Sequence, residues 1–319
     1  MRTVITAAAI LAATLGTTAA APATVAVPGA RAFPESVTST GDGTLYVGSI
    51  GEGGILRAAP GAAEAEPWIA PGSAGTRSIF GLLADERTGT LWACSNDVSG
   101  MGIASPGDAT GSALKAFDLA TGALKSSAAL PGERPFCNDI AIGPDGLVYV
   151  TDTIVSRVLR LAPDGSTLEV WSDDARLKPG GDAPGADGLV FGRDGALYLT
   201  TYGGGDLLRI AVGPDGTAGQ VTKLTPSRPL VLPDTLRLLE DGRLLLVEGG
   251  GTLDLVTLDG DAARIETLAD GFDTPVSVTR VGDTAWVAEG QLGLLFDPAL
   301  KGQQPKLPFR IVAVPLGSP

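Results

Sequence analysis

The chain has 319 residues, among them 45 Gly and 23 Pro, and its formal net charge is -13 at pH 7. This acidic balance argues against binding to nucleic acid or to an anionic membrane surface, because both require basic patches on the protein. The chain contains no histidine, which excludes Ser-His and Cys-His catalysis and removes the commonest protein ligand for zinc, copper and iron.

Residues 1–23 predict a secretory signal peptide. A positive start at Arg2 precedes a short apolar run and then small residues, a pattern that fits cleavage between positions 20 and 23. The apolar run is shorter than the roughly 20 residues that a membrane-spanning helix needs, so a retained membrane anchor is the weaker alternative. We therefore expect an exported protein, periplasmic or extracellular, with no membrane span in its mature form. Residues 24–319 are expected to fold as a single domain.

Asp-Gly turns recur along the chain. Each is followed by a short apolar strand, TLYVGS, LVYVTD, ALYLTT or RLLLVE, and Asp-Gly between apolar runs is a strong hairpin signal. Asp-Gly pairs supply the turn glycines Gly43, Gly146, Gly195 and Gly242. The second repeat has Gly89 in Arg87-Thr88-Gly89 instead, and Gly282, which precedes Asp283, gives a degenerate sixth turn. Their spacing suits a four-stranded propeller blade, which takes about 40–50 residues, and no helical period persists that would favour an α/β barrel. The sequence therefore predicts an all-β fold, a six-bladed β-propeller.

Two regions depart from the regular repeat. In the second repeat, residues 97–112 form an insertion rich in Gly, Ser and Asp, which predicts either a long surface loop or a rim over a pocket. Near the two ends of the mature chain, the segments ATVAVPG and FRIVAVPL both have strand character. We expect one of them to complete a blade with strands from the other terminus and so close the ring, which removes exposed sheet edges.

Cys94 and Cys137 are the only cysteines. In an exported protein such a pair predicts a disulfide. Both residues would lie at the same end of neighbouring repeats, since Cys94 closes the strand LWAC and Cys137 opens the strand that holds Asn138. Closing that loop would stabilise the fold by about 4 kcal/mol in the chain-entropy description. The alternative is two buried free thiols.

Four polar residues each lie seven positions before the Asp of an Asp-Gly turn, namely Glu35, Asn138, Asp187 and Asp234. This shared offset places them at the same height on equivalent innermost strands, so their oxygens would converge on the propeller axis. Carboxylate and amide oxygens are hard donors that suit Ca²⁺, Mg²⁺ or Mn²⁺. We predict one divalent cation bound by Glu35, Asn138 and Asp187, Ca²⁺ first because the protein is exported, with Zn²⁺ as a further alternative. Otherwise each residue only caps a turn or satisfies a strand end, as Asp and Asn often do.

The residues around this ring carry further predictions. Asp234 is expected to be either a fourth ligand or a proton acceptor. Asp139, which follows the ring asparagine, is expected to point to the opposite side of the strand because side chains alternate. In the second repeat, RSIFGLLAD places Ile79 and Phe80 at the pocket. Arg77 lies nearby, either to contact a substrate oxygen or to remain a surface charge.

The segments FPESV, FCNDIAIGPDGLVYVTD and GADGLVFGRDGALYLTTYGGGDLLRI resemble parts of the senescence marker protein and gluconolactonase family, also known from regucalcin. The resemblance extends over essentially the whole mature chain and is strongest between Arg134 and Ile210. It implies a six-bladed propeller with one divalent cation at the axis that hydrolyses sugar lactones and other cyclic esters. By the same resemblance, the family's metal-binding Glu and Asn fall on Glu35 and Asn138. The family's Asp, which also acts as base, falls on Asp187.

The second repeat departs from that family. Where sugar-lactonase members offer a polar residue to the substrate, this chain has Ile79 and Phe80, which favours a less polar substrate. We expect metal-assisted hydrolysis of a lactone, in which Asp187 accepts a proton from the attacking water, by a monomer acting on a small molecule. The first alternative is a non-catalytic propeller that binds a ligand or partner on its face around a structural cation. The second is a lyase on the same scaffold, which usually requires a histidine.

Overall fold

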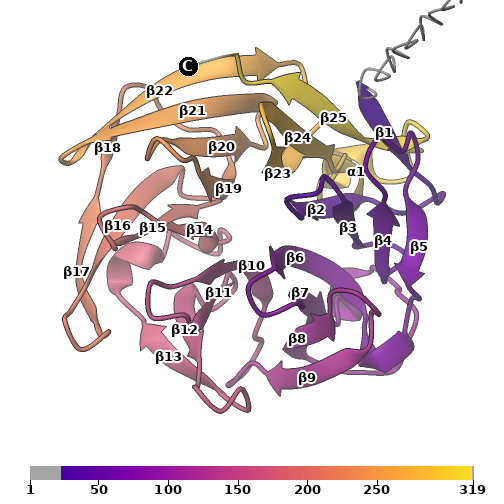
Figure 1. Ribbon diagram of the computed structural model, residues 1–319, viewed down its shortest axis with the longest axis horizontal. Helices are drawn as coiled ribbons and strands as arrows, with labels where there is room; N and C mark the ends of the chain where they lie inside the picture. The colour runs from indigo at the N-terminus through magenta and orange to yellow at the C-terminus, as the bar shows by residue number, and fades with distance from the viewer. Residues whose placement is uncertain (1–22, 318–319) are drawn as a thin grey trace, which may run out of the picture.

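The structure, a computed structural model, describes residues 23–317, so the predicted signal peptide lies outside the described residues except for Ala23. The described chain folds into six sheets arranged as blades around a central axis (Figure 1). The predicted all-β, six-bladed propeller is therefore confirmed. No helix within residues 23–317 is long and apolar enough to span a membrane.

The first four blades follow the chain from the innermost strand to the outermost. The first contains β2 (Pro34–Ser39), β3 (Leu45–Ser49), β4 (Ile55–Ala58) and β5 (Glu66–Ile69). The second contains β6 (Ser78–Asp85), β7 (Thr90–Asn96), β8 (Ser112–Asp118) and β9 (Leu124–Ala129). The third contains β10 (Cys137–Ile142), β11 (Val148–Asp152), β12 (Arg157–Leu161) and β13 (Leu168–Ser172). The fourth contains β14 (Ala186–Phe191), β15 (Leu197–Thr201), β16 (Asp206–Val212) and β17 (Ala218–Lys223).

The last two blades carry the irregular additions. The fifth contains β19 (Pro233–Leu238), β20 (Leu244–Glu248), β21 (Thr252–Asp259) and β22 (Ala262–Asp270), with β18 (Thr225–Pro226) paired parallel to β22. The sixth contains β23 (Pro275–Val281), β24 (Thr284–Glu289), β25 (Phe309–Pro315) and β1 (Thr24–Val27). The helical turns are η1 (Ser73–Gly75), η2 (Ser99–Met101), η3 (Ala175–Leu177), α1 (Gly293–Phe296) and η4 (Pro298–Leu300).

The sixth blade joins the two ends of the described chain. Strand β1 is its outermost strand and pairs antiparallel with β25, so that Val25 lies opposite Ile311, and the two strands lie side by side in Figure 1. Both terminal segments with strand character therefore belong to one blade, as the sequence predicts. Backbone hydrogen bonds between them close the ring, which protects the edges of the sheets.

Every innermost strand carries a bulge at the same height. In β10 the register shifts between Cys137 and Ile140, and equivalent shifts occur in β2, β6, β14, β19 and β23. A bulge sets two residues of one strand against one residue of its partner and re-aims the side chains. Two neighbouring residues of an innermost strand can therefore both contribute to the centre of the ring.

A disulfide links the second and third blades. The sulfur atoms of Cys94 in β7 and Cys137 in β10 are 1.94 Å apart. Asn96 joins the same blades, because its amide nitrogen donates to the Cys137 carbonyl at 2.8 Å and its oxygen accepts from the Cys137 backbone N–H at 3.0 Å. The strand that carries Asn138 is thus fixed to the preceding blade by one covalent bond and two hydrogen bonds.

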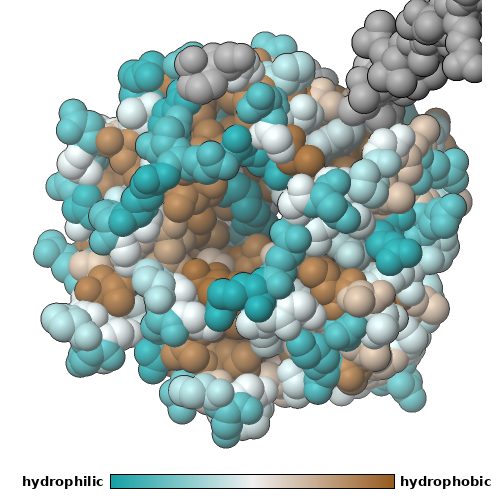
Figure 2. Space-filling model, in the orientation of Figure 1, coloured by the Kyte–Doolittle hydropathy of each residue, from teal (hydrophilic) through white to brown (hydrophobic). Residues whose placement is uncertain are grey.

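Apolar side chains fill the spaces between neighbouring blades. Tyr149 of β11, for example, is 1% exposed and packs edge-on against Phe191 of the next blade, with ring centroids 4.9 Å apart. Such contacts hold each innermost strand at a fixed position relative to the axis. In the space-filling view the face of the ring is hollowed near its centre, with apolar surface beside the hollow (Figure 2).

Candidate active site

A cavity of about 500 Å³ lies at the centre of the ring. The four polar residues that share one register in the sequence all line it: Glu35 from β2, Asn138 from β10, Asp187 from β14 and Asp234 from β19. Each side chain is buried, with exposed fractions of 4–7%. The register thus brings three carboxyls and one amide, from four different blades, to the floor of one cavity.

Hydroxyl groups fix the backbone of these residues from the preceding blade. Thr151 Oγ1 donates to the Asp187 carbonyl at 2.7 Å, and Thr200 Oγ1 donates to the Asp234 carbonyl at 2.8 Å. Two further hydroxyls make the equivalent contact, from Ser36 to the Phe80 carbonyl and from Thr235 to the Val276 carbonyl. Because the bulges leave these carbonyls outside the regular sheet ladder, the hydroxyls satisfy groups that would be costly to bury unpaired.

Two glycines allow the bulges of neighbouring blades to touch. A Cβ atom on Gly81 would lie 1.9 Å from the carbonyl oxygen of Asn138, and one on Gly188 would lie 2.1 Å from that of Asp234. Both distances are far below van der Waals contact, so no other residue fits there without displacing the next blade. These two glycines therefore set how closely the ring residues of adjacent blades approach.

The amide of Asn138 has a fixed orientation. Its Nδ2 donates to Thr153 Oγ1 at 3.0 Å, and that hydroxyl donates in turn to the Ala186 carbonyl at 2.7 Å. Because the hydroxyl proton is committed to Ala186, the Thr153 oxygen can only accept from the amide. The nitrogen of the amide is therefore held by the protein, and Oδ1 is the atom left to act as an acceptor or ligand.

Burial and the charges of neighbouring carboxylates make the three carboxyls hold protons more tightly than usual. Burial, then the charges of Asp187 and Asp139, raises the pKa of Glu35 well above its ordinary value. The pKa of Asp187 is likewise raised, by burial and then by the charge of Asp139. Burial and then the charge of Asp187 raise the pKa of Asp234. Each effect disfavours the charged form, as expected for like charges in a dry environment.

The donor set at the floor of the cavity suits a hard divalent cation. Oδ1 of Asp187 is buried and has no hydrogen-bond partner in the part of the chain that the structure describes. Glu35, Asn138 and Asp187, with Asp234 beside them, offer oxygen donors only, which is the ligand type of Ca²⁺ and Mg²⁺. No three His, Cys, Asp or Glu side chains among residues 23–317 stand close enough to form a metal-binding group by themselves.

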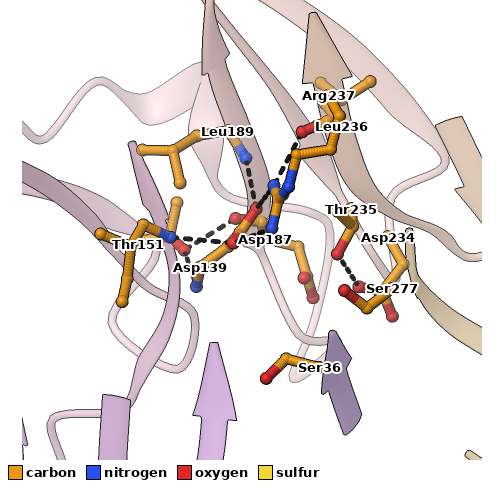
Figure 3. A network of polar contacts seen from close by, with 12 residues as sticks. Ser36, Asp139, Thr151, Asp187, Leu189, Asp234, Thr235, Leu236, Arg237 and Ser277 are labelled. Atoms are coloured by element: carbon orange, nitrogen blue, oxygen red, sulfur yellow. Dashed lines mark hydrogen bonds and ion pairs between the residues drawn. The ribbon is translucent and has the colours of Figure 1, made fainter. Parts of the chain in front are cut away.

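Asp139 does not point away from the centre of the ring, so that prediction is wrong. Its carboxylate accepts hydrogen bonds from both terminal nitrogens of Arg237, at 2.9 and 3.1 Å. Arg237 belongs to β19, two blades further along the chain. The Asp139 carboxylate also accepts from the Leu189 backbone N–H of the intervening blade at 3.2 Å (Figure 3). The bulge in β10 is the physical reason, because it interrupts the alternation of side chains on which the prediction rests. The ion pair lies beside the carboxyls of the floor and neutralises one negative charge there.

The wall of the cavity is largely apolar. Phe80 lines it and packs edge-on against Phe136, with ring centroids 4.7 Å apart. Ile79 does not line it: this side chain is fully buried in a cluster with Tyr46 between the first and second blades. Only one of the two apolar residues predicted to face the pocket therefore does so. Further apolar lining comes from Met101, Ile154, Leu232, Leu292 and Phe296.

Arg77 lies outside the cavity and fastens the insertion. Its Nη1 donates to the Gly107 carbonyl at 2.7 Å, and its Nη2 lies 3.1 Å from the Asp97 carboxylate. The side chain is only 11% exposed. Neither role considered from the sequence, a substrate contact or a surface charge, fits this placement. The insertion at 97–112 is instead an ordered segment tied to the start of β6.

Several lining residues have no counterpart in the sequence-based prediction. Phe136 directly precedes β10 and Thr153 directly follows β11, so their offsets from the turn at Gly146 could have indicated them. Tyr202 follows the end of β15, and burial and then the charge of Asp234 raise the pKa of its hydroxyl. No sequence signal indicates that α1 reaches the cavity, because that contact depends on how the sixth blade is connected.

No protein-family model and no curated protein matches the chain, whereas many solved structures do. The allergen Mala s 1 of Malassezia sympodialis superposes with a TM-score of 0.72 at 16% identity, covering 92% of this chain and 96% of that one. A gluconolactonase of Xanthomonas campestris superposes with a TM-score of 0.61 at 18% sequence identity, covering 88% of this chain and 86% of that one. Virginiamycin B lyase of Staphylococcus aureus superposes with a TM-score of 0.59 at 16% sequence identity, covering 91% of this chain and 82% of that one. That structure is of a catalytically inactive variant in which a histidine is changed to alanine. Such low identities establish the fold alone, which gluconolactonases share with other enzymes.

Proposed function

We propose that this protein hydrolyses lactones with the help of one divalent cation, Ca²⁺ by expectation, bound by Glu35, Asn138 and Asp187. The observation that carries the proposal is the buried, unpartnered Oδ1 of Asp187 at the floor of a cavity shared with two more carboxyls. Buried carboxylates of this kind need either protons or a cation to balance them. The similarity in fold to a gluconolactonase supports the reaction class.

Asp187 is the residue that we assign as general base. A water molecule in the cavity gives a proton to the Asp187 carboxylate while its oxygen bonds to the carbonyl carbon of the lactone. The ring C–O bond then breaks and the proton passes to the departing ring oxygen, so that lactone and water yield one hydroxy acid. A bound divalent cation supplies polarisation of the carbonyl and stabilises negative charge on its oxygen. General base catalysis of this kind contributes about 10²–10⁴ in rate.

Neighbouring residues support that role by holding the groups in place. The hydrogen bond from Asn138 to Thr153 directs the amide oxygen, and the bond from Thr151 to the Asp187 carbonyl fixes the backbone that carries the base. Asp234 is either a fourth ligand or a second proton acceptor. Burial and then the charge of the neighbouring Asp187 raise the pKa of Asp234.

A non-catalytic propeller with a structural cation is the second candidate. The fold alone does not require catalysis. The finding that no three His, Cys, Asp or Glu side chains among residues 23–317 form a metal-binding group bears on a structural cation as much as on a catalytic one. A lyase has less support. The similar lyase variant that lacks one histidine is described as inactive, and this chain contains no histidine at all.

A panel of lactones assayed with and without chelator tests the proposal. We expect cleavage that chelator abolishes and Ca²⁺ restores, and a loss of at least about 10²-fold in Asp187→Asn. Asp259→Asn, which removes an exposed carboxylate from β21, is the matched control and should keep full activity. If the protein binds the cation but cleaves no lactone, the binding propeller is the better description. Cleavage that persists in chelator would remove the cation from the mechanism.

A further inference from the structure

The cavity has two chemically different ends. Its floor carries the three carboxyls and the Asn138 amide, whereas its wall is built by the aromatic pair of Phe80 and Phe136 with Ile154 and Leu292. A ligand that fills both ends must carry oxygen at one end and hydrocarbon at the other. At about 500 Å³ the cavity also has room for more than a single lactone ring, since pockets for drug-sized ligands span about 300–1,000 Å³.

Three large apolar side chains converge on the mouth of this cavity from separate segments. Met101 comes from the insertion in the second blade, Leu232 from the loop before β19, and Phe296 from α1 in the sixth blade. Their exposed fractions are 46%, 38% and 45%. Single exposed apolar residues are normal on a protein surface. Three that line one cavity form a continuous apolar path from its wall to solvent.

The insertion holds its part of this path firmly. Val98 and Ile103, which flank η2, are 1% and 2% exposed and belong to the main apolar core. Arg77 bonds the carbonyls of Gly107 and Ala109, and so anchors the second half of the insertion. Met101 is therefore presented at the mouth by a segment that is fixed on both sides, and the apolar path exists before any ligand binds.

The wall offers little to a polyhydroxylated ligand. Thr153 Oγ1 is committed to the Asn138 amide and the Ala186 carbonyl. The other polar side chains of the lining outside the floor are Tyr202, Thr274 and Asp297, whose Oδ1 accepts from the Ala299 backbone N–H at 2.8 Å. A sugar hydroxyl buried against the aromatic pair would lose its water without gaining a partner. Two such hydroxyls would lower kcat/KM by about 10²-fold or more.

We infer that the substrates of this site are lactones that bear an alkyl or aryl substituent, rather than sugar lactones; this rests on the proposed hydrolysis. The lactone ring lies at the floor beside Asp187, and the substituent runs along Phe80 and Phe136 toward the mouth. Met101 and Phe296 determine specificity, because they cover the far end of the substituent.

A homologous series of δ-lactones with side chains from methyl to hexyl measures this directly. Each added methylene buried on the apolar path should raise kcat/KM by about fourfold, and glucono-δ-lactone should be slower than the hexyl compound. Met101→Ser and Phe296→Ser should each lower kcat/KM for the longest chain by about tenfold and for the methyl compound by less than about twofold. Val170→Ser, which changes a 50% exposed apolar residue on β13, is the control and should leave the whole series unchanged.

Unreactive δ-lactams of the same series separate binding from hydrolysis. Calorimetry on the cation-loaded protein should show a dissociation constant that falls about fourfold per methylene. Lactams that bind with this slope while no lactone is cleaved would keep the ligand class and overturn the hydrolysis. Chelator-sensitive hydrolysis in which glucono-δ-lactone outperforms the hexyl compound would keep the hydrolysis and overturn the ligand class. Absence of both binding and cleavage would overturn both.

Discussion

Cation binding should release protons and stabilise the fold increasingly as the pH rises. Burial raises the pKa of Glu35, Asp187 and Asp234, with further increases from the negative charges of neighbouring carboxylates, Asp139 among them. The metal-free folded protein therefore binds more protons at these carboxyls than the unfolded chain does. Its stability is greatest below the unfolded pKa values, near 4, and falls as the pH rises through the raised folded values. A bound cation would displace those protons and reverse the trend.

The expected size follows from linkage. A cation at about 100 times its dissociation constant adds about 2.7 kcal/mol to the free energy of unfolding, if the unfolded chain does not bind it. A domain of about 150–250 residues gains about 2–4 °C in unfolding temperature per kcal/mol, and a longer chain gains less. We therefore take about 2 °C per kcal/mol here, which gives a rise of about 5 °C. For each proton that the cation displaces, the apparent affinity for the cation should rise about tenfold per pH unit. This holds over the pH range in which those carboxyls are protonated in the cation-free protein.

Thermal unfolding and calorimetry at several pH values between about 5 and 8 would measure both effects. Asp187→Ala removes a charge and a ligand together, so bound metal and the cation-dependent rise should be lost while the propeller stays folded. Asp259→Asn on β21 should behave as the unaltered protein. Elemental analysis that finds full metal occupancy in Asp187→Ala would refute the assignment of this residue. An unfolding temperature indifferent to Ca²⁺, Mg²⁺, Mn²⁺ and Zn²⁺ at every pH would refute the cation site.

Three further sets of substitutions test other parts of the structure. Replacing Cys94 and Cys137 together by Ala should lower the free energy of unfolding by about 4 kcal/mol, the chain-entropy value for their separation of 43 residues. Urea titration measures this loss. Two free thiols found by mass spectrometry in protein from an oxidising compartment would contradict the disulfide on which the prediction rests. Phe80→Asn should narrow the preference for an alkyl lactone over gluconolactone by about tenfold, because it gives one sugar hydroxyl a partner; an unchanged ratio of kcat/KM values would mean that this residue does not face the substrate. Arg237→Met should cost about 3–5 kcal/mol by leaving Asp139 buried without its partner; adding Asp139→Asn should recover part of the loss, and no recovery would argue against the ion pair as the cause.

The fold and the floor of the cavity could be predicted because both depend on local signals that repeat. An Asp-Gly turn between apolar runs specifies a hairpin wherever it occurs, and its recurrence specifies a blade. A residue at a fixed offset from that turn must then take the same height in each blade, which is why Glu35, Asn138, Asp187 and Asp234 line one cavity. The closure of the ring by both ends of the chain follows from the same count of strands.

The wrong or missing predictions depend on features that do not repeat. The predicted direction of the Asp139 side chain is wrong because a bulge interrupts the alternation of side chains along β10. No single residue type marks this bulge in all six innermost strands. The role of Arg77 depends on carbonyls of an insertion whose path has no periodic signal. Met101 and Phe296 reach the cavity mouth from connections that differ between blades. Specificity is therefore harder to predict from this sequence than the polar floor, since the wall and mouth are built from the irregular segments.

The charge balance at the floor connects stability with the proposed chemistry. The carboxyls of Glu35, Asp187 and Asp234 are buried near Asp139, and Asp139 is the one that Arg237 neutralises. Buried like charges are costly unless each is paired or neutralised, so the other three must hold protons or share a cation. A proton on Asp187 prevents this residue from accepting another one from water, whereas a cation keeps it ionised. The ion that relieves the repulsion would therefore also make the base available. For this reason we expect cation binding, cation-dependent stability at neutral pH and lactone hydrolysis to be lost together when Asp187 is replaced.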